Sequence, residues 1–209
     1  GLFLTNHHCG FGAIQSLSST DHDYLKDGFW AMKRNDELKA GFSVSFLQSV
    51  KDVTADVTEG LTEDMTASER NKKISEAYKK LRKDNADEKK HLSADIKSMY
   101  DGNKYYMFIY QSYPDVRLVG APPSSIGKYG GDTDNWMWPR HTGDFSMFRV
   151  YADENNEPAE YSATNKPYKP KHHLPVNIKG VEKGDYAMIF GYPGSTDRYL
   201  TSYGVKWAT

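Results

Sequence analysis

Short apolar runs separated by turn-forming residues make up most of the chain. Runs of this length, rich in Val, Ile, Tyr and Phe, favour β-strands, and the polar segments with Gly or Pro between them favour turns. The predicted strands are Leu2–Thr5, Val44–Leu47, a piece around Val50, Val53 and Val57, Tyr105–Tyr110, Val116–Val119, Phe145–Tyr151, Leu174–Ile178 and Tyr186–Phe190. The predicted turns and loops are Asn6–Gly12, Asp27–Ala31, Gly120–Asp134 and Asp153–Pro158.

The segment from Glu59 to Tyr100 differs in composition from the rest. It is rich in Lys, Glu, Ala and Asp, and it contains no proline. Thr66 and Glu69 have the spacing of a capping box, which predicts the start of a helix. The Lys run within it is interpreted as a solvated helix face. Two stripes at helical spacing are predicted here: Ile74, Tyr78 and Leu81, and then Leu92, Ile96 and Met99.

The order of elements is strands, a helical segment and more strands. This order favours a mainly β fold, a β-barrel with a helical insertion, over an alternating β–α–β layout. The predicted division is residues 1–58 for the first part of the barrel and 59–102 for the helical insertion. Residues 103–209 are predicted to hold the remainder of the barrel and the start of a connection to a C-terminal part.

Composition excludes several classes of protein. The 209 residues carry 27 Lys and Arg against 28 Asp and Glu, so the near-neutral charge gives no indication of nucleic acid or an anionic membrane as partner. No apolar run approaches the roughly 18 residues of a membrane span. Cys9 is the only cysteine, which excludes an internal disulfide. The chain has no initiator Met and opens on a strand, so we expect the natural protein to extend before Gly1.

The first candidate for chemistry is the pair of histidines that follows the first predicted strand. A strand end can hold an imidazole rigidly while the ring stays accessible, as a general base requires. The segment Thr5-Asn6-His7-His8-Cys9 resembles the Thr-Ala-Ala-His-Cys segment around the catalytic histidine of trypsin-like serine peptidases. The resemblance selects His8, the histidine next to the cysteine, as the catalytic base. It leaves His7 as a neighbouring or packing residue.

Asp144 is the candidate carboxylate partner of His8. A catalytic histidine needs a carboxylate on its other ring nitrogen, which fixes the tautomer and stabilises the imidazolium. Asp144 directly precedes a predicted strand, where it can be buried at a barrel junction. The alternative is a turn aspartate that caps the loop. The two residues are 136 positions apart (144 − 8), and the helical insertion accounts for the excess over a plain trypsin-like domain.

Four separated blocks of the sequence together resemble the S46 family of bacterial dipeptidyl-peptidases. The blocks are Leu4–Gln15, Tyr24–Ala31, Asp134–Ser146 and Gly191–Tyr199. The resemblance implies a chymotrypsin-like double β-barrel, of which this chain holds the first barrel, and part of a helical cap domain. It also implies release of dipeptides from the free N-terminus of oligopeptides, without a cofactor or a metal. Members of the family are typically homodimers in the periplasm or at the surface of Gram-negative bacteria.

The resemblance also implies a site for the substrate's α-amino group. The matching positions are Asn135 and Trp136, ahead of Asp144. An ammonium group buried in a cleft needs acceptors and aromatic faces, and an Asn oxygen beside a Trp ring supplies both. The alternative for Asn135 and Trp136 is a pair that packs within the loop.

The serine nucleophile of such a peptidase is expected in a Gly-x-Ser-Gly-like loop, and this sequence contains none. Ser195 lacks the following glycine and is not interpreted as the nucleophile. We therefore predict that the chain is a fragment that is inactive by itself, with the serine, the oxyanion donors and the specificity residues beyond Thr209.

Three other interpretations compete with this one. A metal site of His7, His8 and Cys9, with His172 and His173, is disfavoured because neighbouring residues of an extended strand point to opposite faces. A cysteine peptidase using Cys9 and His8 is disfavoured because adjacent residues align thiol and imidazole poorly. A non-catalytic peptide-binding module on a peptidase scaffold stays open, because the serine that would decide it is absent from the sequence.

Overall fold

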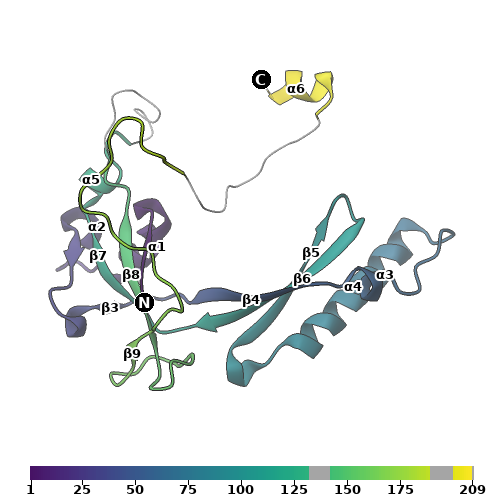
Figure 1. Ribbon diagram of the computed structural model, residues 1–209, viewed down its shortest axis with the longest axis horizontal. Coiled ribbons are helices and arrows are strands. Elements are labelled where there is room, and N and C mark those ends of the chain that lie inside the picture. The colour runs from purple at the N-terminus through teal and green to yellow at the C-terminus, as the bar shows by residue number, and fades with distance from the viewer. Residues whose placement is uncertain (132–141, 189–199, 209) are drawn as a thin grey trace. The chain divides into compact units, whose positions relative to one another are not determined.

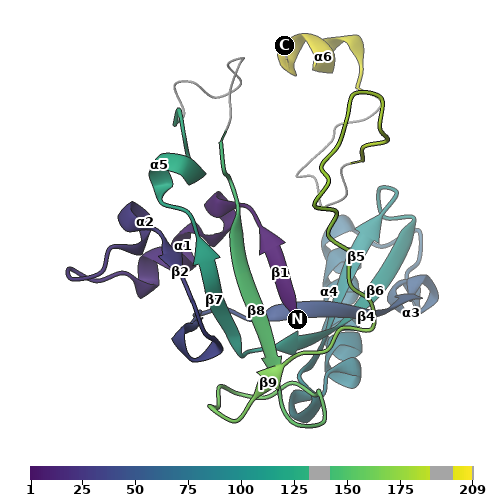
Figure 2. The same cartoon turned by 60° about the vertical axis from the view of Figure 1, so that its left-hand side comes forward.

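The computed structural model describes residues 1–131, 142–188 and 200–208. Residues 1–171 form one compact unit, which contains a six-stranded antiparallel sheet. Its strands are β1 (Leu2–Thr5), β2 (Phe29–Trp30), β3 (Leu38–Lys39), β7 (Val116–Ala121), β8 (Ser146–Ala152) and β9 (Lys166–Pro167). The order is β1–β8–β7–β2, with β3 paired to β7 and β9 to β8. β1, β8 and β7 lie side by side in Figure 2.

Short helices pack against this sheet. They are α1 (His7–Leu17) and α2 (Tyr24–Asp27), and this part of the chain also contains the short helices η1 (Arg34–Asp36) and α5 (Ser124–Gly127). The core between helix and sheet contains Ile14 of α1, Leu118 of β7 and Phe148 of β8, all fully buried. Of the turn predicted at Asp27–Ala31, only the bend at Gly28 is formed, with a φ of 76° in the left-handed region, because Asp27 ends α2 and Phe29–Trp30 form β2.

The turn predicted for residues 6–12 is wrong, because residues 7–17 form helix α1. A Cβ on Gly10 would lie 2.5 Å from Ser146 Oγ and 3.2 Å from Phe148 Cε2. Gly10 is therefore a position where the helix backbone approaches β8 closely, and not the site of a chain reversal.

The second sheet has three antiparallel strands in the order β4–β6–β5. The strands are β4 (Val44–Asp52), β5 (Leu92–Met99) and β6 (Lys104–Tyr113), and the helices of this region are α3 (Thr54–Thr58), α4 (Ala67–Asn85) and η2 (Glu88–Lys90). α4 lies along β5 and β6 (Figure 1), with Ile74, Tyr78 and Leu81 packed on a buried cluster that includes Ile96 and Met107.

Helix α4 confirms the predicted capping box, since Thr66 and Glu69 bond each other reciprocally at its start. The second predicted helical stripe is wrong, because residues 92–99 form strand β5. Ile96 is placed opposite Met107 of β6, and this pairing buries it without a helix. The strand predicted around Val50 ends at Asp52, and Val57 lies in α3.

The fold thus mixes antiparallel sheets with helices and is not mainly β as predicted, because helices cover as much of the chain as strands do, and no closed barrel is formed by the described residues. Residues 172–209 form a separate compact unit with α6 (Ser202–Ala208). The strand predicted at Leu174–Ile178 is not formed, nor are Tyr186–Met188 in a strand, and residues 189 and 190 lie outside the described ranges. The division at residues 58 and 102 stays a prediction. None of the described helices is long and apolar enough to cross a membrane.

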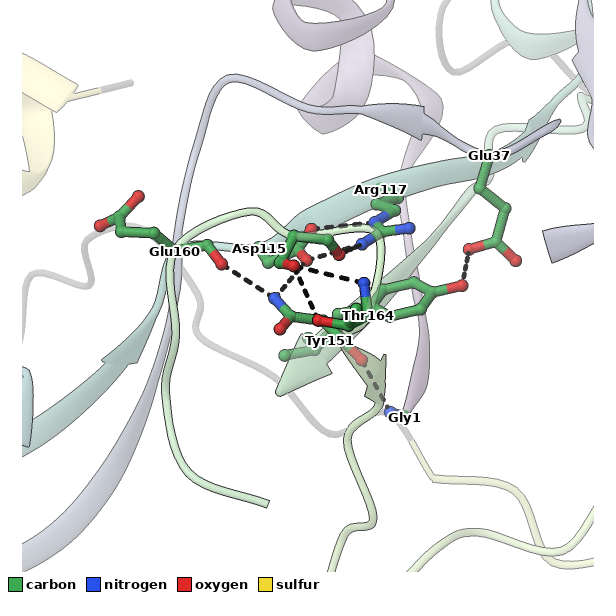
Figure 3. Close-up of polar contacts among 10 residues, drawn as sticks. Gly1, Glu37, Asp115, Arg117, Tyr151, Glu160 and Thr164 are labelled. Atoms are coloured by element: carbon green, nitrogen blue, oxygen red, sulfur yellow. Dashed lines mark hydrogen bonds and ion pairs between the residues drawn. The ribbon is translucent and has the colours of Figure 1, made fainter. Parts of the chain in front are cut away.

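A buried network of hydrogen bonds connects β7 with the loop that precedes β9 and contains Ser162 (Figure 3). Arg117 of β7 donates to both oxygens of fully buried Asp115, at 2.9 and 2.7 Å, and to the carbonyl of Ser162 at 2.9 Å. Its guanidinium carbon lies 3.8 Å from the ring centre of Tyr151. Burial, together with the hydrogen bond to the Glu37 carboxylate, raises the pKa of Tyr151 to about 12.

Replacing Arg117 by methionine is expected to lower the free energy of unfolding by about 3 to 5 kcal/mol, because Asp115 would stay buried without its counter-ion. Urea denaturation of the chain measures this. Lys39→Met is the matched control, since Lys39 pairs with Arg117 across the strands but is exposed, and it should cost less than about 1 kcal/mol. Equal losses in the two variants would contradict the assignment.

Candidate active site

The candidate site lies where β1 leads into α1. Asn6 is the N-cap residue, with extended backbone (φ −68°, ψ 153°), and His7 and His8 form the first turn of the helix. The two histidine side chains differ sharply in environment. His7 is 1% exposed and its ring packs against Gly127 of α5, whereas the side chain of His8 is 67% exposed. His7 is therefore a packing residue, and His8 presents an accessible ring.

Asp144 is brought to the same place by the segment that enters β8. Gly143 donates its backbone N–H to the carbonyl of Ile126 in α5 at 3.0 Å. A side chain at Gly143 would come within 2.8 Å of Ile126 Cγ2, so this close approach needs glycine. The hydroxyl of Thr142 donates to the same Ile126 carbonyl at 2.9 Å. These contacts fix the backbone immediately before Asp144.

The structure pairs the two predicted catalytic residues directly. His8 Nδ1 lies 2.8 Å from Asp144 Oδ2, and the His8 backbone N–H donates to Asp144 Oδ1 at 3.1 Å. Because an ionised carboxylate only accepts hydrogen bonds, the neutral ring must carry its proton on Nδ1. Nε2 of His8 is then left as an acceptor on an exposed ring, which is the state that a general base requires.

The environment of Asp144 keeps its carboxyl group ionised. Burial by itself would raise the pKa of Asp144, but the backbone and side-chain hydrogen bonds from His8 outweigh it, with a smaller contribution from the His7 backbone, and the net pKa is lowered. The positive end of the α1 dipole acts in the same direction. The interpretation of Asp144 as a plain loop cap is therefore incomplete, since its partner is a helix that is distant in sequence.

Asn6 belongs to the site although the sequence alone assigned it no role. Its Nδ2 donates to Asp144 Oδ2 at 3.2 Å and to the Asp144 carbonyl at 3.3 Å. The signal that could have identified it is Asn at the position before a helix, a favoured N-cap. Interpreting the two following glycines as a turn concealed that helix.

Other predicted residues do not join the pair or cannot be placed. Asn135, Trp136 and Ser195 lie outside the described residues. Cys9 is exposed and unbridged among the described residues. In the described part of the chain, no three His, Cys, Asp or Glu side chains gather in a way that could hold a metal ion.

This chain is similar to known dipeptidyl-peptidases over almost its whole length. A Flavobacterium psychrophilum Asp/Glu-specific dipeptidyl-peptidase is 54% identical over 206 residues, covering 98% of this chain and 29% of the relative. A Porphyromonas endodontalis dipeptidyl-peptidase 7 is 54% identical over 209 residues, covering 99% of this chain and 25% of the relative. The chain therefore resembles peptidases over its whole length, and it spans less than a third of the relatives it matches.

The chain belongs to peptidase family S46, whose model matches residues 1–209. Among solved structures, Porphyromonas endodontalis DPP11 in complex with the dipeptide Arg-Glu has a TM-score of 0.86 and 48% identity. That match covers 99% of this chain and 30% of the solved chain. The predicted family membership is confirmed.

Proposed function

We propose that the complete protein is a serine exopeptidase that releases dipeptides from the free N-terminus of oligopeptides. The observation that carries the proposal is the 2.8 Å contact between His8 Nδ1 and Asp144 Oδ2, in a His8 side chain that is 67% exposed. The solved DPP11 complex with a dipeptide supports a dipeptide as product. An Asp/Glu-specific dipeptidyl-peptidase and a dipeptidyl-peptidase 7 match at the same 54% identity, so similarity does not select a side-chain preference.

In the proposed mechanism, His8 and Asp144 form the acid–base half of a catalytic triad. Nε2 of His8 takes the proton of a serine hydroxyl as the serine attacks the scissile carbonyl, and then gives that proton to the leaving amine. Asp144 holds the imidazole in the Nδ1–H tautomer and stabilises the imidazolium. The serine and the oxyanion donors belong to the part of the complete protein beyond this chain, so we propose that the isolated chain is inactive. Turnover of a dipeptidyl substrate by the purified chain would contradict this.

The proposed architecture follows from the family resemblance. We place the six-stranded sheet in the first barrel of a chymotrypsin-like double barrel, and the insertion of residues 59–102, which contains α4, in part of a helical cap. Asn135 and Trp136 are proposed to bind the substrate's α-amino group. The complete protein is proposed to act as a homodimer in the periplasm or at the surface of a Gram-negative bacterium.

The complete protein is expected to cleave fluorogenic dipeptides with a free N-terminus and to cleave their acetylated forms at least about 100-fold more slowly. A buried ammonium that loses its charge and donors leaves its acceptors unpaired, which typically costs this much or more. The ratio of kcat/KM for matched free and acetylated substrates measures the effect. Equal cleavage of both forms would overturn the roles proposed for Asn135 and Trp136.

The alternative function is a non-catalytic peptide-binding module on the same scaffold. It predicts binding of free-amine peptides without turnover by the complete protein. Isothermal titration with an oligopeptide, combined with mass spectrometry of the mixture, separates the two functions. Binding without released dipeptide supports the module, and release of dipeptide supports the peptidase.

A further inference from the structure

Asn6 makes an unusual use of a helix N-cap position. Asparagine at this position ordinarily accepts a hydrogen bond from a backbone N–H in the first turn. The Asn6 side chain makes no such bond to α1. Instead its amide nitrogen donates to Asp144, at 3.2 Å to Oδ2 and 3.3 Å to the main-chain oxygen. The side chain is therefore directed at the candidate catalytic carboxylate.

Asp144 caps the N-terminus of α1, the role that the Asn6 side chain does not fill. Its Oδ1 accepts the His8 backbone N–H in the first turn of α1 at 3.1 Å. Its Oδ2 accepts from two side chains, His8 Nδ1 at 2.8 Å and Asn6 Nδ2 at 3.2 Å. Asp144 caps the helix from a distant part of the chain, and Asn6 holds the oxygen of Asp144 that faces the imidazole.

Asn6 is itself fixed between the helix and β8. Its carbonyl accepts the hydroxyl of fully buried Ser146 at 3.0 Å and the backbone N–H of Gly10 at 3.1 Å. Ser146 lies two residues after Asp144, so the same short segment is bonded to Asn6 twice. The Asn6 amide donates to Asp144, and the Ser146 hydroxyl donates to the Asn6 carbonyl. The backbone of Asn6 therefore has little freedom, and its amide points to a fixed position.

We propose that Asn6 is a positioning residue for the His8–Asp144 pair. The helix backbone holds one carboxylate oxygen, and the Asn6 amide holds the other, the oxygen that bonds His8. Without the amide, the Asp144 carboxylate can rotate while it keeps its hydrogen bond to the His8 backbone N–H. The His8 imidazole, which is hydrogen-bonded to the other carboxylate oxygen, would then change its orientation as well. Asn6 acts only through Asp144 and touches no reacting atom. The inference rests on the proposed function, because it concerns the geometry of that same catalytic pair.

Two substitutions in the complete protein separate positioning from helix capping. Asn6→Ser keeps a side-chain oxygen that can cap α1 but removes the amide. Asn6→Asp keeps size and shape, removes the donors and adds a negative charge beside Asp144. We expect kcat to fall about 10- to 100-fold in Asn6→Ser and further in Asn6→Asp, because small misplacements of catalytic groups have effects of this size. KM and the thermal unfolding midpoint should change little.

The pH profile supplies a readout that a purely structural role would not move. A second carboxylate at residue 6 favours the imidazolium, so the acid limb of kcat/KM in Asn6→Asp should move to higher pH, by about 0.5 to 1 unit at low salt. Asn103→Asp is the matched control, because Asn103 lies in the turn between β5 and β6, and its side-chain amide donates to the Tyr100 carbonyl and to no other described residue. It should leave both kcat and the acid limb unchanged.

The outcomes distinguish this inference from the proposed function. If His8→Ala retains activity, the proposed function fails whatever the Asn6 variants do. If His8→Ala is inactive but both Asn6 variants keep kcat within about twofold of the original, only the role of Asn6 is overturned. A fall in kcat that follows a fall in the unfolding midpoint, with no shift of the acid limb, also overturns it, because Asn6 would then act only on the fold.

Discussion

Replacement of His8 by alanine in the complete protein is expected to lower kcat by about 10⁴-fold or more, to the level of binding and oxyanion stabilisation alone. The reason lies in the geometry of the pair. Nε2 is the one ring nitrogen of His8 that is left to accept a proton, since Nδ1 bonds Asp144 at 2.8 Å. Steady-state kinetics on a free-amine dipeptide substrate measures the loss.

His22→Ala is the matched control for this experiment. His22 is also exposed, and its one ring contact among the described residues is with Tyr24, with ring centres 6.0 Å apart, so its loss should leave kcat unchanged. Substrate binding by His8→Ala should persist with nearly unchanged affinity, because a general base contributes to the transition state more than to the ground state. Activity of His8→Ala within about tenfold of the original would mean that another residue is the base.

Replacement of Asp144 by asparagine is expected to lower kcat by about 10⁴-fold without unfolding the site. The backbone N–H of His8 needs an acceptor, so the oxygen of the new amide should face it, and the NH₂ group then faces His8 Nδ1. An NH₂ donor opposite Nδ1 forces the proton of the neutral ring onto Nε2. The exposed nitrogen then donates where it must accept, and the base is lost through the wrong tautomer.

Asp153→Asn is the control for this change. The Asp153 carboxylate likewise accepts backbone N–H groups, from Asn155 at 2.9 Å and Glu157 at 2.8 Å, but it bonds no histidine among the described residues. It should retain full kcat. If Asp144→Asn were equally active, Asp144 would be only the cap of α1.

The lowered pKa of Asp144 also sets the sign of its effect on stability. A carboxyl group with a lower pKa in the folded state binds fewer protons there than in the unfolded chain. Its stabilisation is fully present above the unfolded value of about 4 and is lost as the pH falls through the folded value. The difference in stability between the original protein and Asp144→Asn should therefore shrink on acidification.

Local sequence determined the elements whose signals are complete within a few residues. The capping box of Thr66 and Glu69 and the stripe of Ile74, Tyr78 and Leu81 define α4, because caps and helical periodicity act within single turns. The strands β1, β6, β7 and β8 were predicted from apolar runs. The candidate pair of His8 and Asp144 was also predicted from sequence, through family resemblance more than through spacing.

Tertiary contacts determined the structure of segments whose apolar spacing fits both a helix and a strand. Leu92, Ile96 and Met99 fit a helix, but residues 92–99 also fit a strand, and the pairing of Ile96 with Met107 selected the strand. Gly10 could mark a turn or a close approach, and contact with Ser146 selected the second. Leu174, Val176 and Ile178 are more than 80% exposed, and no described strand pairs with them.

The orientation of the candidate site was likewise beyond the sequence. Sequence placed His8 at the end of a strand and Asp144 at the start of another, 136 residues apart, without fixing which atoms meet. The pairing of β1 with β8, with Thr5 opposite Ser146, brings the two chain segments together. The N-terminus of α1 then binds the carboxylate, and Asn6 and His8 share one of its oxygens. Hydrogen bonds between distant segments exist only after the sheet has formed, so only the tertiary structure determines them.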